Sequence, residues 1–203
     1  MKKMAVLASG SGSNLQALID RVHEKEGLIA VVISNKKNAY ALKRAKKADI
    51  PAIYADRSQV ETDEAYDTDI LKILHAYAVD VIVLAGYLRI LTPVLTEAYA
   101  NRIINIHPSL IPSFCGDGYY GMHVHQAVYD RGVKITGATV HFVDSGVDTG
   151  PIIMQRAVCL TGNEQPEEIA AKVLEIEHEL LVESVTLVLN DQIEIVQKRT
   201  IRK

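Results

Sequence analysis

An asparagine and a histidine stand two residues apart where an apolar run ends, in the segment INIHPSLIP (104–112). On an extended chain, alternate residues point to the same side, so the side chains of Asn105 and His107 can reach one point. An Asn amide donates without charge, and an imidazole donates when protonated or takes a proton when neutral. The pair suits acyl transfer through an oxyanion, for which one donor is commonly worth about 3 kcal/mol. The alternative is a strand end whose side chains satisfy loop carbonyls.

A segment rich in glycine and serine, SGSGSN (9–14), follows the first apolar run and opens a helical pattern. Glycine lets the backbone approach a ligand closely, and the free amides at a helix N-terminus favour an anion. The segment lacks the third glycine of the dinucleotide fingerprint, and no acidic residue clearly ends the second predicted strand. It therefore favours a single phosphate, with a tight turn and a capping serine as the alternative.

Two aspartates in HFVDSGVDTGP (141–151) are candidates for a carboxylate beside the histidine. A nearby carboxylate raises the pKa of an imidazole, which is otherwise mostly neutral near neutral pH. Asp148 lies in a D-x-G-P turn whose Gly150 and Pro151 would hold the backbone, and Asp144 directly follows a predicted strand. The spacing alone does not choose between the two aspartates.

The segment AGYLRIL (85–91) follows the most apolar predicted strand. Apolar side chains beside backbone polar groups suit a flat heteroaromatic ligand. Core packing beneath a loop explains the same residues equally well, so this segment alone does not establish a site.

Two other groups of residues are weaker candidates. His123 and His125 form an H-x-H pair with His141 nearby, but a zinc site needs three or four ligands, and the two cysteines are not at ligand spacing. No metal is expected. Cys115 lies in a loop with no base at a defined spacing, and we interpret it as an incidental thiol.

The elements that must position these segments alternate between short β-rich runs and helical patterns. This alternation predicts an α/β fold with a doubly wound, mostly parallel sheet, followed by an antiparallel C-terminal part. Ligands of such sheets bind beyond the carboxyl ends of the strands, where 10–14, 86–91 and 105–107 would meet. Strands are expected at 4–9, 28–35, 52–55, 79–87, 102–107, 134–143, 150–160 and 193–197, and helices at about 14–25, 39–50, 62–78, 93–99, 123–131 and 165–189.

The bulk composition limits the class of protein. The chain has 203 residues, 48% of them hydrophobic and 23% charged, which predicts one soluble globular domain over 1–203. A net charge of −3 disfavours a nucleic-acid or anionic-membrane partner, and we interpret the short basic end at 198–203 as solvated. The chain has two cysteines, no secretory pattern and no long apolar run, which together predict a cytoplasmic protein with free thiols. We expect a monomer or a homodimer.

Four segments together resemble the folate-dependent formyltransferase family, and within it the branch that formylates glycinamide ribonucleotide. They are ASGSGSNLQALID, VIVLAGYLRILTP, RIINIHPSLIPSF and TGATVHFVDSGVDTGPIIMQ. The resemblance covers nearly the whole chain. It implies a Rossmann-like α/β domain, 10-formyltetrahydrofolate as the formyl donor, the amine of glycinamide ribonucleotide as the acceptor, and no metal.

The resemblance also implies roles for particular residues. Asn105, His107 and Asp148 match the catalytic trio of the family, with Asp148 chosen because it is the aspartate of D-x-G-P. The ribonucleotide site is implied at Gly12, Ser13, Asn14 and Glu177. The folate site is implied at Leu88, Arg89, Ile90, Leu91, Asn105, Asp144 and Val147.

The sequence departs from the family pattern at two places. The segment CGDGYYGMHVH (115–125) is about five residues longer than the usual family form, so we expect it to reshape the folate side or act as a flap. Asp63 stands where some relatives carry a basic residue that meets the tail of the folate.

Three other readings compete. Formyltetrahydrofolate hydrolases carry a domain before this one, and the first strand here is expected by residue 4. Methionyl-tRNA formyltransferases carry a further domain and basic surface for RNA. A non-catalytic regulator would need only the two ligand-binding loops, and the joint presence of Asn105, His107 and Asp148 disfavours it.

Overall fold

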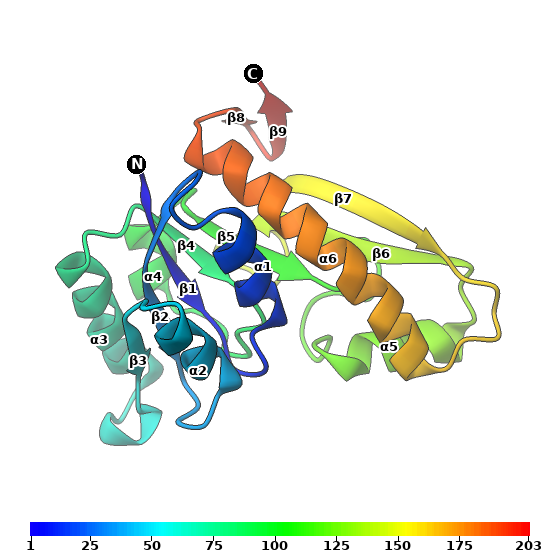
Figure 1. The fold of residues 1–203 in the computed structure, drawn as a ribbon. Helices are drawn as coiled ribbons and strands as arrows, with labels where there is room; N and C mark the ends of the chain where they lie inside the picture. Colours follow the sequence, from blue (N-terminus) through cyan, green and yellow to red (C-terminus); the bar gives the residue numbers. More distant parts are fainter.

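A seven-stranded sheet forms the centre of the protein, with helices on both faces (Figure 1). The computed structural model describes all 203 residues. The strands run in the order β3-β2-β1-β4-β5-β6-β7; β1 to β5 are parallel, and β6 is antiparallel to both β5 and β7. The predicted fold class is confirmed. The strands are β1 (Lys3–Leu7), β2 (Leu28–Ser34), β3 (Ala52–Tyr54), β4 (Val81–Leu84), β5 (Ile103–His107), β6 (Ile135–Phe142) and β7 (Ile152–Cys159).

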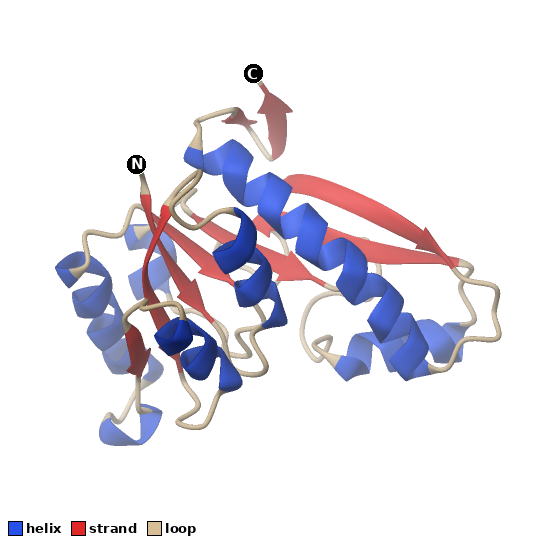
Figure 2. Ribbon diagram, in the orientation of Figure 1, coloured by secondary structure: helices blue, strands red, loops and turns tan.

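Six α-helices and one short 3-10 helix connect the strands, as Figure 2 shows. The longest helix begins with a capping box in which the side chains of Gln165 and Glu168 each accept from the other's backbone amide, with Pro166 in the first turn. None of the helices is long and apolar enough to cross a membrane. The helices are α1 (Ser13–Arg21), α2 (Tyr40–Lys47), η1 (Arg57–Gln59), α3 (Asp63–Ala76), α4 (Pro93–Ala98), α5 (Met122–Arg131) and α6 (Pro166–Leu189).

The sheet separates two apolar layers because side chains alternate across each strand. In β1, Met4 and Val6 pack on the side of α1, α2, α5 and α6, whereas Ala5 and Leu7 pack on the side of α3 and α4. The parallel strands β1, β2, β4 and β5 are buried on both faces, which explains why their sequences read as continuous apolar runs, whereas the edge strand β3 is only partly buried.

The chain changes direction between β1 and β4, which are neighbours in the middle of the sheet. From β1 the chain continues outward to β2 and β3, then returns to β4 and proceeds to β5 on the opposite side. The loops that follow β1 and β4 therefore diverge, and such a switch point leaves a crevice at the carboxyl ends of the strands.

The C-terminal residues differ from the prediction. The expected last strand is present as β8 (Ile193–Val196), but it pairs with β9 (Arg199–Arg202) in a separate two-stranded sheet. The four basic residues of this end, Lys198, Arg199, Arg202 and Lys203, are exposed, as a solvated end requires, although Arg199 and Arg202 belong to a strand. Gln197 makes the turn with a φ of 59°, and the Thr200 hydroxyl donates to the Ile152 carbonyl at 2.7 Å, which fixes the hairpin to β7.

Leu180→Ala is expected to lower the free energy of unfolding by about 2–5 kcal/mol, because Leu180 in α6 is fully buried in the larger core layer. Urea unfolding followed by far-UV circular dichroism measures the change. Leu88→Ala is the matched control, since Leu88 is 57% exposed and the same truncation there removes little buried surface. Equal losses in the two variants would contradict the assignment of α6 to the core.

Candidate active site

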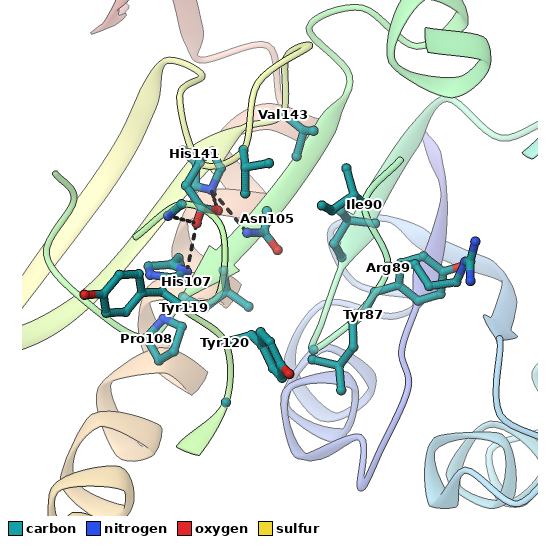
Figure 3. Close-up of a pocket in the computed structure, with 18 of the residues that line it drawn as sticks. Tyr87, Arg89, Ile90, Asn105, His107, Pro108, Tyr119, Tyr120, His141 and Val143 are labelled. Carbon is teal, nitrogen blue, oxygen red and sulfur yellow. Dashed lines mark hydrogen bonds and ion pairs between the residues drawn. The ribbon is translucent and has the colours of Figure 1, made fainter. Parts of the chain in front are cut away.

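A cavity of about 610 Å³ lies at the carboxyl ends of the central strands, at the switch point of the sheet (Figure 3). Six separate parts of the chain form its walls, and they include all three loops that the sequence analysis placed at this edge. The lining residues are Asn14, Leu84, 86–91, 105–108, 116–121, His125, His141, Val143, Asp144, 146–148 and Glu177.

A buried carboxylate lies between two imidazoles on one wall of this cavity. One oxygen of Asp148 is 3.5 Å from Nδ1 of His107, and the other is 3.5 Å from Nε2 of His141. The backbone amide of Gly116 donates to Asp148 at 3.0 Å. Asn105 joins the group through a 3.1 Å contact between its Nδ2 and Nε2 of His141. Asn105, His107 and Asp148, predicted from distant motifs, thus lie side by side.

Backbone carbonyls fix which ring nitrogen of each histidine faces the cluster. Nε2 of His107 lies 2.8 Å from the carbonyl of Phe114, which can only accept, so this nitrogen carries a proton. Nδ1 of His141 donates in the same way to the carbonyl of Phe142 at 2.8 Å. The atoms left to face Asp148 are therefore Nδ1 of His107 and Nε2 of His141.

Burial and charge act in opposite directions on His107. Its side chain is 5% exposed, and this burial lowers the pKa of His107 below its ordinary value, although the charge of Asp148 opposes the change. Burial also acts to raise the pKa of Asp148, but hydrogen bonds from His141 and Gly116 outweigh it and hold that pKa below its usual value. Asp148 is thus ionised, and its charge favours the protonated form of His107 against the effect of burial.

The turn between β6 and β7 explains why Asp148, and not Asp144, joins the histidines. The Asp144 carboxylate accepts from the Gly146 amide and from the Thr149 hydroxyl, so it closes the turn. A Cβ on Gly150 would lie 1.9 Å from the Phe142 carbonyl, so only glycine permits this close approach of the chain. Asp148 itself has a φ of 58°, which aspartate adopts more readily than most residues.

Asn14 and Glu177, which are 163 residues apart in sequence, meet on another wall. Nδ2 of Asn14 donates to the Glu177 carboxylate at 2.7 Å, and burial raises the pKa of Glu177 to about 7, against the opposing effect of that hydrogen bond. The Oδ1 atom of Asn14 is buried without a hydrogen-bond partner. Gly12 has a φ of 71° before α1, and neither Gly12 nor Ser13 lines the cavity. This wall offers a carboxyl group and an unpaired amide oxygen to a ligand.

The turn after β4 forms the opposite wall and leaves apolar side chains uncovered. Leu88 and Ile90 are 57% and 64% exposed, and the Leu88 amide donates to the Ser9 hydroxyl at 2.9 Å. Arg89 stacks over the Tyr66 ring and donates to Asp63 at 2.6 Å. The uncovered side chains form an apolar surface of the size and kind that a flat ligand needs.

Asp63 is held by arginines from two segments. Its Oδ1 atom accepts from Nε of Arg57 and from Nη2 of Arg89, both at 2.6 Å. The hydrogen bond from Arg57, followed by that from Arg89, holds the pKa of Asp63 below its usual range. The charge of this acidic residue is therefore paired by its neighbours at the edge of the wall formed by the turn after β4.

Several lining residues were not predicted as part of the site. His141 directly opposes Asn105 in the pairing of β5 with β6, a register that one sequence does not reveal. His125 is buried in the cavity wall, and burial lowers its pKa to about 4, whereas His123 of the same H-x-H pair is exposed. Tyr119 and Tyr120 line the cavity from the loop between β5 and α5.

The structure holds no group of three or more His, Cys, Asp or Glu side chains arranged to bind a metal ion. Burial, with the charge of Asp148, raises the pKa of the Cys115 thiol. A thiol with a raised pKa is a poorer nucleophile at neutral pH, in agreement with the interpretation of Cys115 as incidental.

Comparisons with known proteins agree on one family. Residues 2–185 match the family described as formyl transferase. The chain is 43% identical over 182 residues to phosphoribosylglycinamide formyltransferase of Haemophilus influenzae, covering 89% of this chain and 84% of that protein. It is 39% identical to the chloroplastic phosphoribosylglycinamide formyltransferase of Vigna unguiculata, covering 95% of this chain but only 62% of the length of that relative.

The fold agrees with the sequence comparisons. Glycinamide ribonucleotide transformylase 1 from Symbiobacterium toebii superposes with a TM-score of 0.94 at 39% identity, over 100% of this chain and 94% of that chain. Similarity at this level of identity, over nearly the full length of both chains, extends to the family as well as the fold. The chain therefore belongs to the formyl transferase family and, within it, to the phosphoribosylglycinamide formyltransferases.

Proposed function

We propose that this protein transfers the formyl group of 10-formyltetrahydrofolate to the amine of glycinamide ribonucleotide, as a step of purine biosynthesis. The observation that carries the proposal is the convergence of Asn105, His107 and Asp148 between two different walls of one cavity. One wall offers polar groups to the acceptor, and the other offers an apolar surface to the donor. The whole chain, 1–203, acts as one formyltransferase domain in this proposal.

The donor binds against the turn after β4 and the turn between β6 and β7. The flat ring system of the folate covers the exposed side chains of Leu88, Ile90 and Val147, which otherwise face solvent. Backbone groups of the two turns supply hydrogen bonds to the edge of the ring. The residues proposed for this site are Leu88, Arg89, Ile90, Leu91, Asn105, Asp144 and Val147.

The acceptor binds on the opposite side. Gly12, which precedes α1, and Ser13, its first residue, hold the phosphate end, because the free amides of a helix N-terminus favour an anion. Asn14 and Glu177 meet the remainder of the ribonucleotide, whose hydroxyl and amine groups can donate to the unpaired Oδ1 of Asn14 and to the Glu177 carboxyl. Buried polar groups of this kind gain a partner when the ligand binds.

The reaction begins when the acceptor amine attacks the formyl carbon, forming a new C–N bond and a tetrahedral oxyanion. Asn105 donates to this oxygen from Nδ2, and His107 donates from Nδ1, the nitrogen that Phe114 leaves free. Collapse of the intermediate breaks the bond between the formyl carbon and N10 of the folate. Asp148, directly or through a water molecule, passes the proton from the attacking amine to N10.

Protonation of His107 is part of this mechanism, because a neutral ring with its proton on Nε2 has no donor at Nδ1. Burial lowers the pKa of His107, and Asp148 opposes that change. Asp148 therefore has two roles: it favours the protonated ring, and it accepts a proton during transfer. At 3.5 Å from Nδ1 the carboxylate acts on His107 through its charge, which leaves the Nδ1 proton for the oxyanion.

An absorbance assay of 10-formyltetrahydrofolate conversion, with and without glycinamide ribonucleotide, tests the proposal. We expect conversion only when the ribonucleotide is present. Conversion to the same extent without it would favour a hydrolase. Binding of both ligands without turnover would favour the non-catalytic regulator.

His107→Ala is expected to lower kcat by at least about 100-fold, because it removes one donor to the oxyanion. His75→Ala is the control, since His75 is exposed in the last turn of α3, away from the cavity. Steady-state rates and thermal unfolding of both variants separate catalysis from folding. Near-normal turnover by His107→Ala would contradict its role.

Asp148→Asn is expected to move the alkaline limb of the kcat/KM profile to lower pH. The charge of Asp148 raises the pKa of His107, so its removal lets burial lower that pKa further, and the donor is lost at a lower pH. Rates measured across pH 5 to 9 give the limb, with Asp130→Asn on the exposed end of α5 as the control. An unchanged limb would show that His107 and Asp148 are not coupled.

Wild-type protein is expected to lose stability as pH rises from about 4.5 to 7, and Glu177→Gln is expected to abolish this loss. The folded-state pKa of Glu177 is raised to about 7, so the folded protein binds the proton more tightly than the unfolded chain does. The contribution of Glu177 to the free energy of unfolding is therefore fully present below pH 4.5 and is lost as pH rises through 7. This contribution is on the order of 3 kcal/mol. Urea unfolding at several pH values, with exposed Glu175→Gln as the control, measures the difference.

A further inference from the structure

The loop between β5 and α5 carries two neighbouring tyrosines, Tyr119 and Tyr120, that line the cavity. We propose that Tyr120 is a specificity-determining residue for the acceptor, and that its ring packs against the ribose of the ribonucleotide. This inference rests on the proposed function and adds a residue to its acceptor site.

The base of the loop is fixed to the catalytic cluster. The carbonyl of Phe114 accepts from His107 at 2.8 Å, and the amide of Gly116 donates to Asp148 at 3.0 Å. Within the base of the loop itself, the Ser109 hydroxyl donates to the carbonyl of Ser113 at 2.6 Å. The start of the loop is therefore held in one position relative to the reacting groups.

The tip of the loop is shaped by glycines on both sides of the tyrosines. Gly118 and Gly121 have φ values of 83° and 51°, a region that other residues rarely adopt. A Cβ at either glycine would meet no atom within 4 Å, so their role is to set the backbone path and not to permit close packing. This path brings Tyr119 and Tyr120 to the rim of the cavity.

The two rings rest on different neighbours. The ring of Tyr119 lies edge-on to Phe114 at 6.3 Å, back toward the base of the loop. The ring of Tyr120 lies 4.8 Å from that of His123 and is half exposed, so one face of it remains uncovered in the cavity. An uncovered aromatic face on a fixed loop is a surface for an apolar part of a ligand.

The elements around the loop place Tyr120 on the acceptor side. The loop leads into α5, which packs against α6, the helix that carries Glu177, and α6 in turn packs against α1, which carries Asn14. Figure 3 shows Tyr120 across the cavity from Val143 and Ile90, which belong to the donor side. The loop therefore closes the half of the cavity opposite the folate.

The chemistry of the acceptor fits this position. Its amine must lie at Asn105 and its phosphate end at the start of α1, so the ribose spans the space between them. One face of a ribose presents C–H groups, which can pack on an aromatic ring while the hydroxyls bond elsewhere. The Tyr120 ring would also keep water away from the formyl carbon on this side.

The test compares Tyr120→Ala and Tyr120→Phe with wild-type protein. We expect Tyr120→Ala to raise the calorimetric Kd and the KM of glycinamide ribonucleotide about tenfold, the usual size of a lost apolar contact, with an unchanged KM for 10-formyltetrahydrofolate. Tyr120→Phe keeps the ring and is expected to retain wild-type affinity. Tyr129→Ala is the matched control, because Tyr129 is an exposed tyrosine of α5 that does not line the cavity.

Three outcomes would overturn the inference. The first is an unchanged Kd of the ribonucleotide in Tyr120→Ala, and the second is a change confined to the KM of the folate. The third is an equal loss of ribonucleotide affinity in Tyr120→Phe and Tyr120→Ala, which would assign the contact to the hydroxyl. Wild-type protein that neither binds nor formylates the ribonucleotide would overturn the proposed function as well. Normal wild-type turnover with any of the three outcomes would overturn the inference alone.

Discussion

The placement of one buried carboxylate determines how the site is built. Asp148 must stay ionised while about nine-tenths of its side chain is shielded from water, and a buried charge is tolerated only with partners. The partners come from three places: a strand end, a neighbouring strand and a loop amide. Each of these depends on a different feature of the fold, so the carboxylate links the antiparallel part of the sheet to the parallel part.

The two parts of the sheet contribute differently. The parallel strands end at a switch point and provide the two binding walls, which is a general property of this architecture. The turn between the antiparallel strands β6 and β7 provides the carboxylate of Asp148, because the tight return at Gly150 brings the chain back toward β5. A purely parallel sheet would offer the crevice without a carboxylate beside the strand end.

Much of this arrangement was predictable from the sequence, and the remainder depends on spatial facts. The strand and helix order follows from periodicity, and Asn105 and His107 follow from their spacing at a strand end. The choice of Asp148 over Asp144 rests on a turn geometry that spacing does not contain, although the family motif supplied it. His141 was missed because its register opposite Asn105 is a pairing property, and β9 was missed because its turn at Gln197 lacks the usual glycine or asparagine. The charge of His107 depends on burial, which a sequence does not measure.

The hydrogen bonds that join His107 and Asp148 to the loop after β5 go to its main chain, namely to the Phe114 carbonyl and the Gly116 amide. Every amino acid other than proline offers the same carbonyl and amide, so these bonds do not depend on which side chains the loop carries. The loop can thus gain residues or exchange them during evolution while the bonds to the histidine and aspartate persist. Under the roles proposed for Tyr120, His107 and Asp148, substrate preference and chemical competence depend on separate parts of the same short segment, and one can drift without disabling the other.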